Sequence, residues 1–375
     1  MNNRECSCRH TIPMMISIID FLRTADSYRK KLMRKRYLYV KGVKAMTEET
    51  LRRCENLVHN RNIIKKAYFG CDSMSALSGA LIFNIKNLEA DEGTLHRCEE
   101  LLKKNVSLFS YFRGNAVYMV LASLAASDDP EGFMQNSKLA YQTLKKRFMS
   151  TQYLPIAAMI LAGQTKPCQY EEYADRARTI YEKAYRKHPF LTSGEDYAAC
   201  VLLALLNKPV DSVMQDTEDC YQLLRKDFFS ANSVQALAFV LAMHEGTPMN
   251  KYERTLHLFR CLKEQGRKYG TSYELATLGM LAMSTEDERA LAQEIIEIDT
   301  WLAAQQGFGF WSSISPTYRL MGASIIAVQG HAKEDASISG SMLAVIATQE
   351  IAVIMALVSS SEAAAAMASI NNINC

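Results

Sequence analysis

The sequence predicts an all-α protein built from about seven αα-hairpin repeats of roughly forty residues. Three observations support this fold class. A motif of an aromatic residue, any residue and a hydroxyl recurs at nearly constant spacing. An Ala- and Leu-rich segment of helical length follows each clear copy. No segment alternates apolar and polar residues with the period of a β-strand. Two helices in each repeat indicate hairpins that bury their apolar faces against neighbouring hairpins.

The recurring motif is clearest at Phe148-Met149-Ser150, Phe228-Phe229-Ser230 and Phe310-Trp311-Ser312. All copies are separated by 38 to 42 residues, because they begin at residues 69, 109, 148, 190, 228, 270 and 310. A hydroxyl just before an apolar helix predicts an N-cap. We expect the aromatic residue to pack into the groove between adjacent hairpins, where its loss would cost about 3–5 kcal/mol.

The first helix of each repeat is predicted where nearly all residues are apolar, as at 154–162, 197–204, 235–242 and 275–282. Such helices must be buried on most sides. The second helix is amphipathic and has Lys or Arg in its last turn, where a positive charge suits the helix dipole. Hairpins of this kind are expected to form an open α-solenoid. The alternative is a closed α/α toroid, in which the inner helices line a central cavity.

The repeat array is predicted to span residues 61–334, with a flanking segment at each end. Residues 1–60 are expected to form a basic helical segment. Residues 335–375 are Ala-rich, and small residues recur there every four positions from Gly340 to Ala364. A row of small residues lets another helix approach closely. We therefore expect a C-terminal helix that caps the last hairpin, with a homodimer contact as the alternative.

Composition excludes several classes of protein. The 375 residues are 49% apolar and 22% charged, which excludes collagen-like and broadly disordered chains. Lys and Arg exceed Asp and Glu by only three, so the chain lacks the charge bias of a dedicated nucleic-acid binder. Ten irregularly spaced cysteines without a Cys-x-x-Cys pair are typical of reduced cysteines and predict a cytoplasmic protein. The C-terminal apolar run carries Gln349 and Glu350 at its centre, so no membrane span is expected.

The sequence predicts no catalytic residue, metal site or cofactor. It contains no Gly-rich phosphate loop, no Gly-x-Ser-x-Gly and no pair of histidines at metal-ligand spacing. The acidic pair Asp128-Asp129 is interpreted as a solvated turn. The favoured function is therefore a non-enzymatic scaffold or adaptor that binds an unknown protein or peptide.

The candidate partner-binding residues are polar residues that follow the aromatic starts, because equivalent positions share one edge of a stack. They are Arg113, Asn115, His188, Asn232 and Gln235.

In the toroid alternative, the protein is an enzyme or small-molecule binder, and Asp196, Trp311 and Tyr318 contribute to a central pocket. That alternative requires a pocket of at least about 300 Å³. A third hypothesis is nucleic-acid binding through the basic stretch at 29–36.

Three segments carry a resemblance to a known family. Phe109–Gly114 and His188–Tyr197 resemble a bacterial family known as domain of unknown function 4003, and Asn232–Ala238 is similar to the family's Asn-x-x-Gln-x-Leu segment. The resemblance covers roughly residues 60 to 330. The chain departs from it at Ala238-Phe239, where the family pattern has Ser-His. Because the family has no established activity, the resemblance implies a bacterial cytosolic helical protein.

Overall fold

The computed structural model describes residues 46–331 except 268, 270–273 and 310–313. Within these residues every regular element is a helix, which confirms the all-α prediction. The basic segment proposed for nucleic-acid binding, Trp311 and the C-terminal segment 335–375 with its homodimer contact lie outside the described residues, and so does the N-terminal segment up to residue 45.

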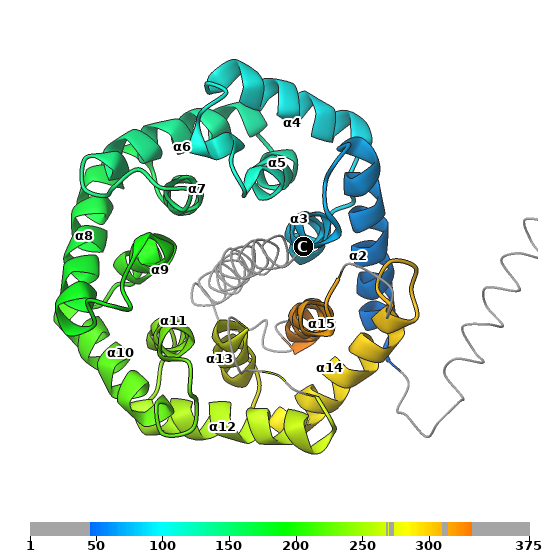
Figure 1. Cartoon of the computed structure of the whole chain (residues 1–375), viewed down its shortest axis with the longest axis vertical. Coiled ribbons are helices and arrows are strands. Elements are labelled where there is room, and N and C mark those ends of the chain that lie inside the picture. The colour runs from blue at the N-terminus through cyan, green and yellow to red at the C-terminus, as the bar shows by residue number, and fades with distance from the viewer. Residues whose placement is uncertain (1–45, 268, 270–273, 310–313, 332–375) are drawn as a thin grey trace, which may run out of the picture. The chain divides into compact units, whose positions relative to one another are not determined.

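Fourteen described α-helices form seven consecutive hairpins, each made of an outer and an inner helix (Figure 1). The outer helices are α2 (Glu48–Ala67), α4 (Glu92–Asn105), α6 (Pro130–Lys145), α8 (Tyr170–Lys187), α10 (Val210–Leu224), α12 (Pro248–Glu264) and α14 (Glu288–Ala303). The inner helices are α3 (Ser73–Ile85), α5 (Val117–Ala125), α7 (Leu154–Gln164), α9 (Tyr197–Leu205), α11 (Ala231–Ala242), α13 (Leu275–Met283) and α15 (Pro316–His331). Three short 3₁₀ turns, η1 (Tyr111–Arg113), η2 (Pro167–Gln169) and η3 (Gly194–Asp196), occur in the connections.

The two layers differ because their sequences differ. Every residue from Leu154 to Ala162 of α7 and from Tyr197 to Ala204 of α9 is buried. The outer helices bury one stripe only; in α8 it recurs every three or four residues, at Tyr170, Ala174, Ala177, Ile180 and Ala184. The inner helices therefore form the core, and each is covered by an outer helix (Figure 1). Most also pack against the inner helices of both adjacent hairpins, whereas α5 and α7 make little contact with each other.

The last hairpin contacts the first. Helix α15 packs against α2 and α3, and the buried hydroxyls of Tyr318 and Ser78 are hydrogen bonded at 2.6 Å. On the outer layer, the Thr50 hydroxyl donates to Glu294 at 3.1 Å. These contacts join the two ends of the row of hairpins (Figure 1), so they favour the closed alternative over the open solenoid. Because α2 supplies the outer helix of the first hairpin, the boundary predicted at residue 60 falls inside this helix.

The hydroxyl of the recurring motif caps one of the described helices, α11. Ser230 accepts a hydrogen bond from the Ser233 backbone N–H at the start of α11. Ser110 and Ser193 accept from backbone N–H groups at the starts of η1 and η3, but neither is the third residue of its motif copy. Ser150 does not cap α7, because its buried hydroxyl has no partner among the described residues and α7 begins without a side-chain cap. The N-cap prediction for the motif hydroxyl is therefore correct for Ser230 and wrong for Ser150 and for Thr192, whose hydroxyl accepts from the Gln235 side chain instead.

The expectation that the motif aromatic packs between hairpins is wrong for Phe69, Phe109 and Phe190, which are exposed. Phe148 and Phe228 are buried as expected, but the residue after each of them is exposed. Phe69, Phe109 and Phe190 lie in hydrogen-bonded turns, in which Cys71 N–H donates to Tyr68 C=O, Ser110 to Ser107 and Leu191 to His188. Their side chains face solvent from these turns. Phe69 follows the buried Tyr68. The repeat therefore places an apolar side chain in solvent where we expected a core position.

Glycine at position 307 is required at the junction between the last hairpin and the first. Gly307 has a φ of 85°, and a Cβ there would lie 2.5 Å from Nη1 of Arg61 in α2. The Arg61 guanidinium is itself held over the Phe308 ring, 5.4 Å from its centroid. Gly70 has nearly the same φ, 86°, but a Cβ at that position would have no neighbour within 4 Å.

We predict that Gly307→Ala lowers the free energy of unfolding by about 2–3 kcal/mol, because strained backbone and a steric clash add together. Gly70→Ala, which introduces the backbone strain alone, should cost about 1 kcal/mol. Urea unfolding of both variants measures the difference. Equal losses would mean that the Arg61 side chain moves aside and that the predicted clash costs nothing.

Candidate functional site

A cavity of about 270 Å³ lies between α8, α10 and α11, in adjacent hairpins. His188 and Gln235, two of the predicted partner-binding residues, both line it. Its apolar lining includes Ala184, Ala238 and Phe239, and its polar lining comes mostly from the outer helices. Ala238 and Phe239 are the two positions at which the sequence departs from the family pattern. The fold thus brings together residues of three helices that are far apart in sequence.

His188 is fixed on one side of the cavity by a charged neighbour. Its Nε2 lies 2.8 Å from Oε2 of Glu218, and its ring lies against Tyr221 with centroids 4.4 Å apart. Burial raises the pKa of Glu218, but hydrogen bonds from Gln222 and His188 outweigh it, so this pKa lies below its ordinary value. Glu218 is therefore ionised at neutral pH and orients the imidazole.

Gln235 has a buried acceptor without a partner among the described residues. The residue is 2% exposed, and its amide nitrogen donates to Oγ1 of Thr192 at 3.2 Å. Its Oε1 accepts no hydrogen bond from any described residue. A buried acceptor left unpaired costs about 1–3 kcal/mol. An N–H or O–H group of a ligand in the cavity would remove this cost.

Asp196 lies behind Gln235, at the end of η3. Burial raises the pKa of its carboxyl to about 7, although hydrogen bonds from the Ser193 backbone N–H and from Gln235 act in the opposite direction. The Ser193 N–H donates to Oδ2 at 2.8 Å. Asp196 therefore supports the loop that carries Thr192, and it contacts the cavity through Gln235.

The other predicted site residues lie elsewhere. The Asn115 amide donates to Gln152 at 2.9 Å between the α4–α5 and α6–α7 loops, and Arg113 belongs to η1 in the same α4–α5 connection. Asn232 lies one turn before Gln235 in α11 but does not line the cavity. Tyr318 joins α15 to α3, whereas Asp196 precedes α9 across the ring, so these two residues do not share a pocket.

A second cavity, of about 670 Å³, was not predicted from the sequence. It lies among α3, α5, α6 and α7, and apolar residues such as Ile82, Met119 and Ile160 form much of its lining. Asp128 and Asp129 also line it, and Asp129 caps α6 by accepting the Gly132 N–H at 2.9 Å. In the sequence, the acidic pair Asp128-Asp129 is the feature that could have pointed to this cavity. The apolar residues of the lining come from four helices, which only the fold brings together.

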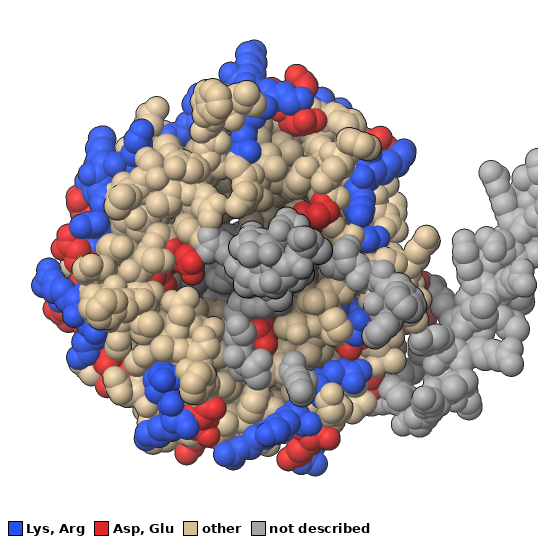
Figure 2. Space-filling model, in the orientation of Figure 1, with Lys and Arg blue, Asp and Glu red and all other residues tan. Residues whose placement is uncertain are grey.

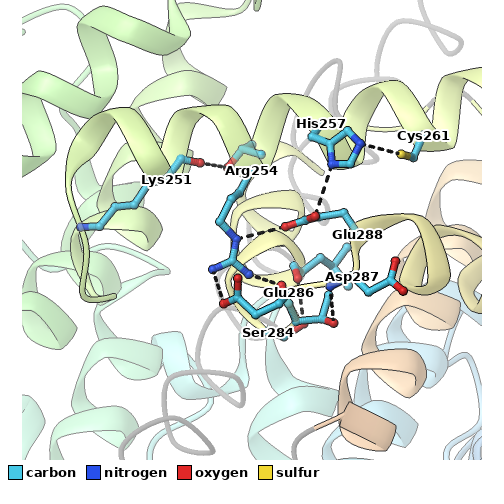
Figure 3. A network of polar contacts seen from close by, with 11 residues as sticks. Lys251, Arg254, His257, Cys261, Ser284, Glu286, Asp287 and Glu288 are labelled. Atoms are coloured by element: carbon cyan, nitrogen blue, oxygen red, sulfur yellow. Dashed lines mark hydrogen bonds and ion pairs between the residues drawn. The ribbon is translucent and has the colours of Figure 1, made fainter.

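A polar network connects α12 to α14 (Figure 3). Arg254 donates to Glu286 and Glu288, and Glu288 also contacts Nδ1 of His257 at 3.3 Å. Cys261 Sγ lies 3.6 Å from His257 Nε2. Thiol, imidazole and carboxylate follow the order of a cysteine nucleophile and its base. However, burial raises the pKa of Cys261, the opposite of what a thiolate nucleophile requires. We therefore assign the network to the packing of adjacent hairpins.

The remaining chemistry of the described residues is sparse. They contain no group of three or more His, Cys, Asp or Glu side chains placed to hold a metal ion. All seven cysteines in this part of the chain are free, and Cys168 is the exposed member of the set. None of the helices from α2 to α15 combines the length and the apolarity that a membrane-spanning helix requires.

The fold and the cavity define a protein of seven helical hairpins with a small concave site between two of them. The family model described as "Protein of unknown function (DUF4003)" matches residues 62–363, and the chain belongs to this family. The resemblance found in the sequence is thus confirmed. A relative from Bacillus subtilis (strain 168), "Uncharacterized protein YeaA", is 22% identical over 223 residues. That match covers 56% of this chain and 65% of the relative, so the chain spans less than two thirds of that relative's length. No solved structure matches.

The raised pKa of Asp196 predicts a pH-dependent stability. The carboxyl binds a proton up to about pH 7 in the folded protein but only up to about pH 4 when unfolded. The free energy of unfolding therefore falls as the pH rises from about 4 to about 7. Above pH 7 the folded protein bears the whole cost of burying the ionised carboxylate. Asp196→Asn removes the penalty and keeps an acceptor for Ser193.

We predict that Asp196→Asn is more stable than the wild type at pH 8 by about 2–4 kcal/mol, and that the difference shrinks towards pH 5. Urea unfolding at both pH values measures it. Glu195→Gln, a change at the neighbouring and less buried carboxylate, is the control. Parallel pH profiles of wild type and Asp196→Asn would contradict the prediction.

Proposed function

We propose that the protein is a non-enzymatic scaffold or adaptor of the cytoplasm, a closed α/α toroid that recognises a peptide segment of a partner protein in the cavity between α8, α10 and α11. One observation carries this proposal: the Oε1 of Gln235, buried in the wall of an open cavity, has no partner among the described residues. When a peptide is bound, an N–H or O–H group of the peptide would donate a hydrogen bond to this acceptor.

The size and lining of the cavity favour a peptide side chain over a whole small molecule. A volume of about 270 Å³ is below the usual range for small-ligand sites. The floor of Ala184, Ala238 and Phe239 accepts an apolar side chain. A backbone N–H or hydroxyl beside that side chain would donate to Gln235, and the exposed Lys187 and Asp211 would contact polar neighbours in the peptide.

The polar groups around the cavity support binding more than catalysis. The Glu218 carboxylate and the Tyr221 ring hold His188 in place. Asp196, whose pKa of about 7 would suit a general acid or base, contacts Gln235 and does not line the cavity. The matching family is described as one of unknown function, so the match favours neither binding nor catalysis.

The larger cavity favours a second candidate function, the binding of a small molecule. Its volume of about 670 Å³ lies within the usual range for such sites. Its apolar walls and the carboxylates of Asp128 and Asp129 would suit an apolar ligand with a cationic or donor group. The site lies between hairpins and is not the central pocket expected for a toroid enzyme.

A random peptide library displayed on phage, selected against the full chain, tests the peptide proposal. We predict that selected peptides share an apolar anchor and that Gln235→Met weakens peptide binding by about tenfold, because it removes the buried acceptor for the peptide. The change also removes the Gln235 hydrogen bond to Thr192, so thermal unfolding should confirm that the variant is folded. Met214→Trp, which places a large ring at the cavity lining, should abolish binding. Fluorescence anisotropy of labelled peptides measures both effects.

Gln142→Met is the matched control, because Gln142 is exposed on α6 in another hairpin. It should leave peptide affinity unchanged. A selection without enrichment, or peptides that bind Gln235→Met and Met214→Trp as tightly as wild type, would contradict the proposal.

A further inference from the structure

Five consecutive hairpins each expose a large apolar side chain on the loop that leads from the outer to the inner helix. These tip residues are Phe69, Phe109, Met149, Phe190 and Phe229, and they are 105%, 93%, 77%, 99% and 97% exposed. In the second hairpin, Leu108 adds another exposed side chain. Other large apolar residues among those described are at most half exposed. The corresponding loops of the last two hairpins include residues outside the described part.

The five loops emerge on one face of the ring. Each precedes the N-terminus of an inner helix, and the inner helices are seen nearly end-on around the centre of Figure 1. Neighbouring loops are hydrogen bonded to each other: Asn115 to Gln152, and Tyr153 to Glu195 at 3.5 Å. The side chain of Thr192 likewise accepts from Gln235 of the next hairpin. We call this face, with its five tip residues, the tip face.

A lysine accompanies every tip residue. Lys65, Lys104, Lys145, Lys187 and Lys226 are exposed, and each precedes its tip residue by three to five positions. None of the five side chains forms an ion pair with a described carboxylate, and among them the Lys65 ammonium alone donates to a described residue, to Oγ of Ser73. Figure 2 shows lysines and arginines around the perimeter of the ring, interspersed with acidic residues. Each tip therefore combines an apolar end with an adjacent positive charge.

Apolar groups next to lysine are characteristic of surfaces that enter the boundary between lipid headgroups and acyl chains. The apolar group enters the boundary, and lysine contacts anionic headgroups. The tip residues project singly from successive loops, so they form no groove that would enclose a segment of a partner protein. Tips that lie around one face of a ring can meet a flat surface together, and a bilayer offers such a surface.

We propose that the tip face docks the protein onto an anionic lipid bilayer, with the five apolar tips inserted at the level of the headgroups and the lysines paired with lipid charges. The helices remain outside the bilayer. The tip face shares Lys187 with the lining of the peptide cavity, but the five tip residues and the other four lysines do not line that cavity. The tests below change none of the cavity residues, so each proposal can fail without the other.

Flotation of the full chain with vesicles tests the proposal. We expect binding to vesicles of equal parts phosphatidylcholine and phosphatidylglycerol, weaker binding to phosphatidylcholine alone, and loss of binding as salt is raised. Phe190→Ser combined with Phe229→Ser should weaken the binding by about tenfold or more. Lys104→Glu, Lys145→Glu and Lys226→Glu together should have a comparable effect and abolish the salt dependence.

Leu139→Ser combined with Met249→Ser is the matched control, because both residues are about half exposed and lie on outer helices. It should bind as the wild type does, and thermal unfolding should confirm that all variants are folded. Absence of binding to anionic vesicles at low salt would overturn the proposal. So would binding that the Phe190 and Phe229 changes leave intact, which would place the contact on another segment. Capture of a protein that requires the tip residues, without vesicle binding, would assign the face to that protein instead.

Discussion

The burial of the inner helices is the constraint on which the rest of the structure depends. A helix such as α9, with no polar face from Tyr197 to Ala204, needs neighbours on nearly every side. An outer helix covers one side, and the inner helices of adjacent hairpins cover two more. In an open row, the first and last inner helices would each lack a neighbour. The contacts of α15 with α2 and α3 supply both missing neighbours at once.

Much of this architecture could be predicted from local sequence. The apolar composition of the inner helices and the spacing of 38 to 42 residues indicated seven hairpins, because helix formation and neighbour packing depend on residues close in the chain. The contacts between the last and first hairpins could not be predicted. They depend on pairs such as Ser78 and Tyr318, or Thr50 and Glu294, which no periodic pattern links. The first outer helix was also assigned in part to a separate segment, because it begins without the motif that marks the later repeats.

The candidate site was predicted in part. The place of His188 and Gln235 beside a motif start predicts a role in binding, and the fold brings both residues to one cavity. Position beside a motif start also predicts Arg113 and Asn115 as binding residues, but these two belong to an earlier hairpin. Position in a repeat indicates at which edge of the stack a residue lies. It does not indicate which hairpins form a cavity. The exposure of Phe69 could not be predicted either. An aromatic residue at a helix start fits burial and exposure equally well, and only the path of the loop decides between them.

The contacts between the last and first hairpins also affect how the chain unfolds and whether it can gain or lose a repeat. An open array of repeats has terminal units that fray first, and it can lose or gain a repeat there without disturbing the others. A row whose ends are joined has no such terminal unit. Opening it anywhere exposes two apolar helix faces, so we expect the hairpins to unfold as one cooperative unit. The number of repeats is then fixed by geometry, because the curvature of each hairpin must bring α15 back to α3.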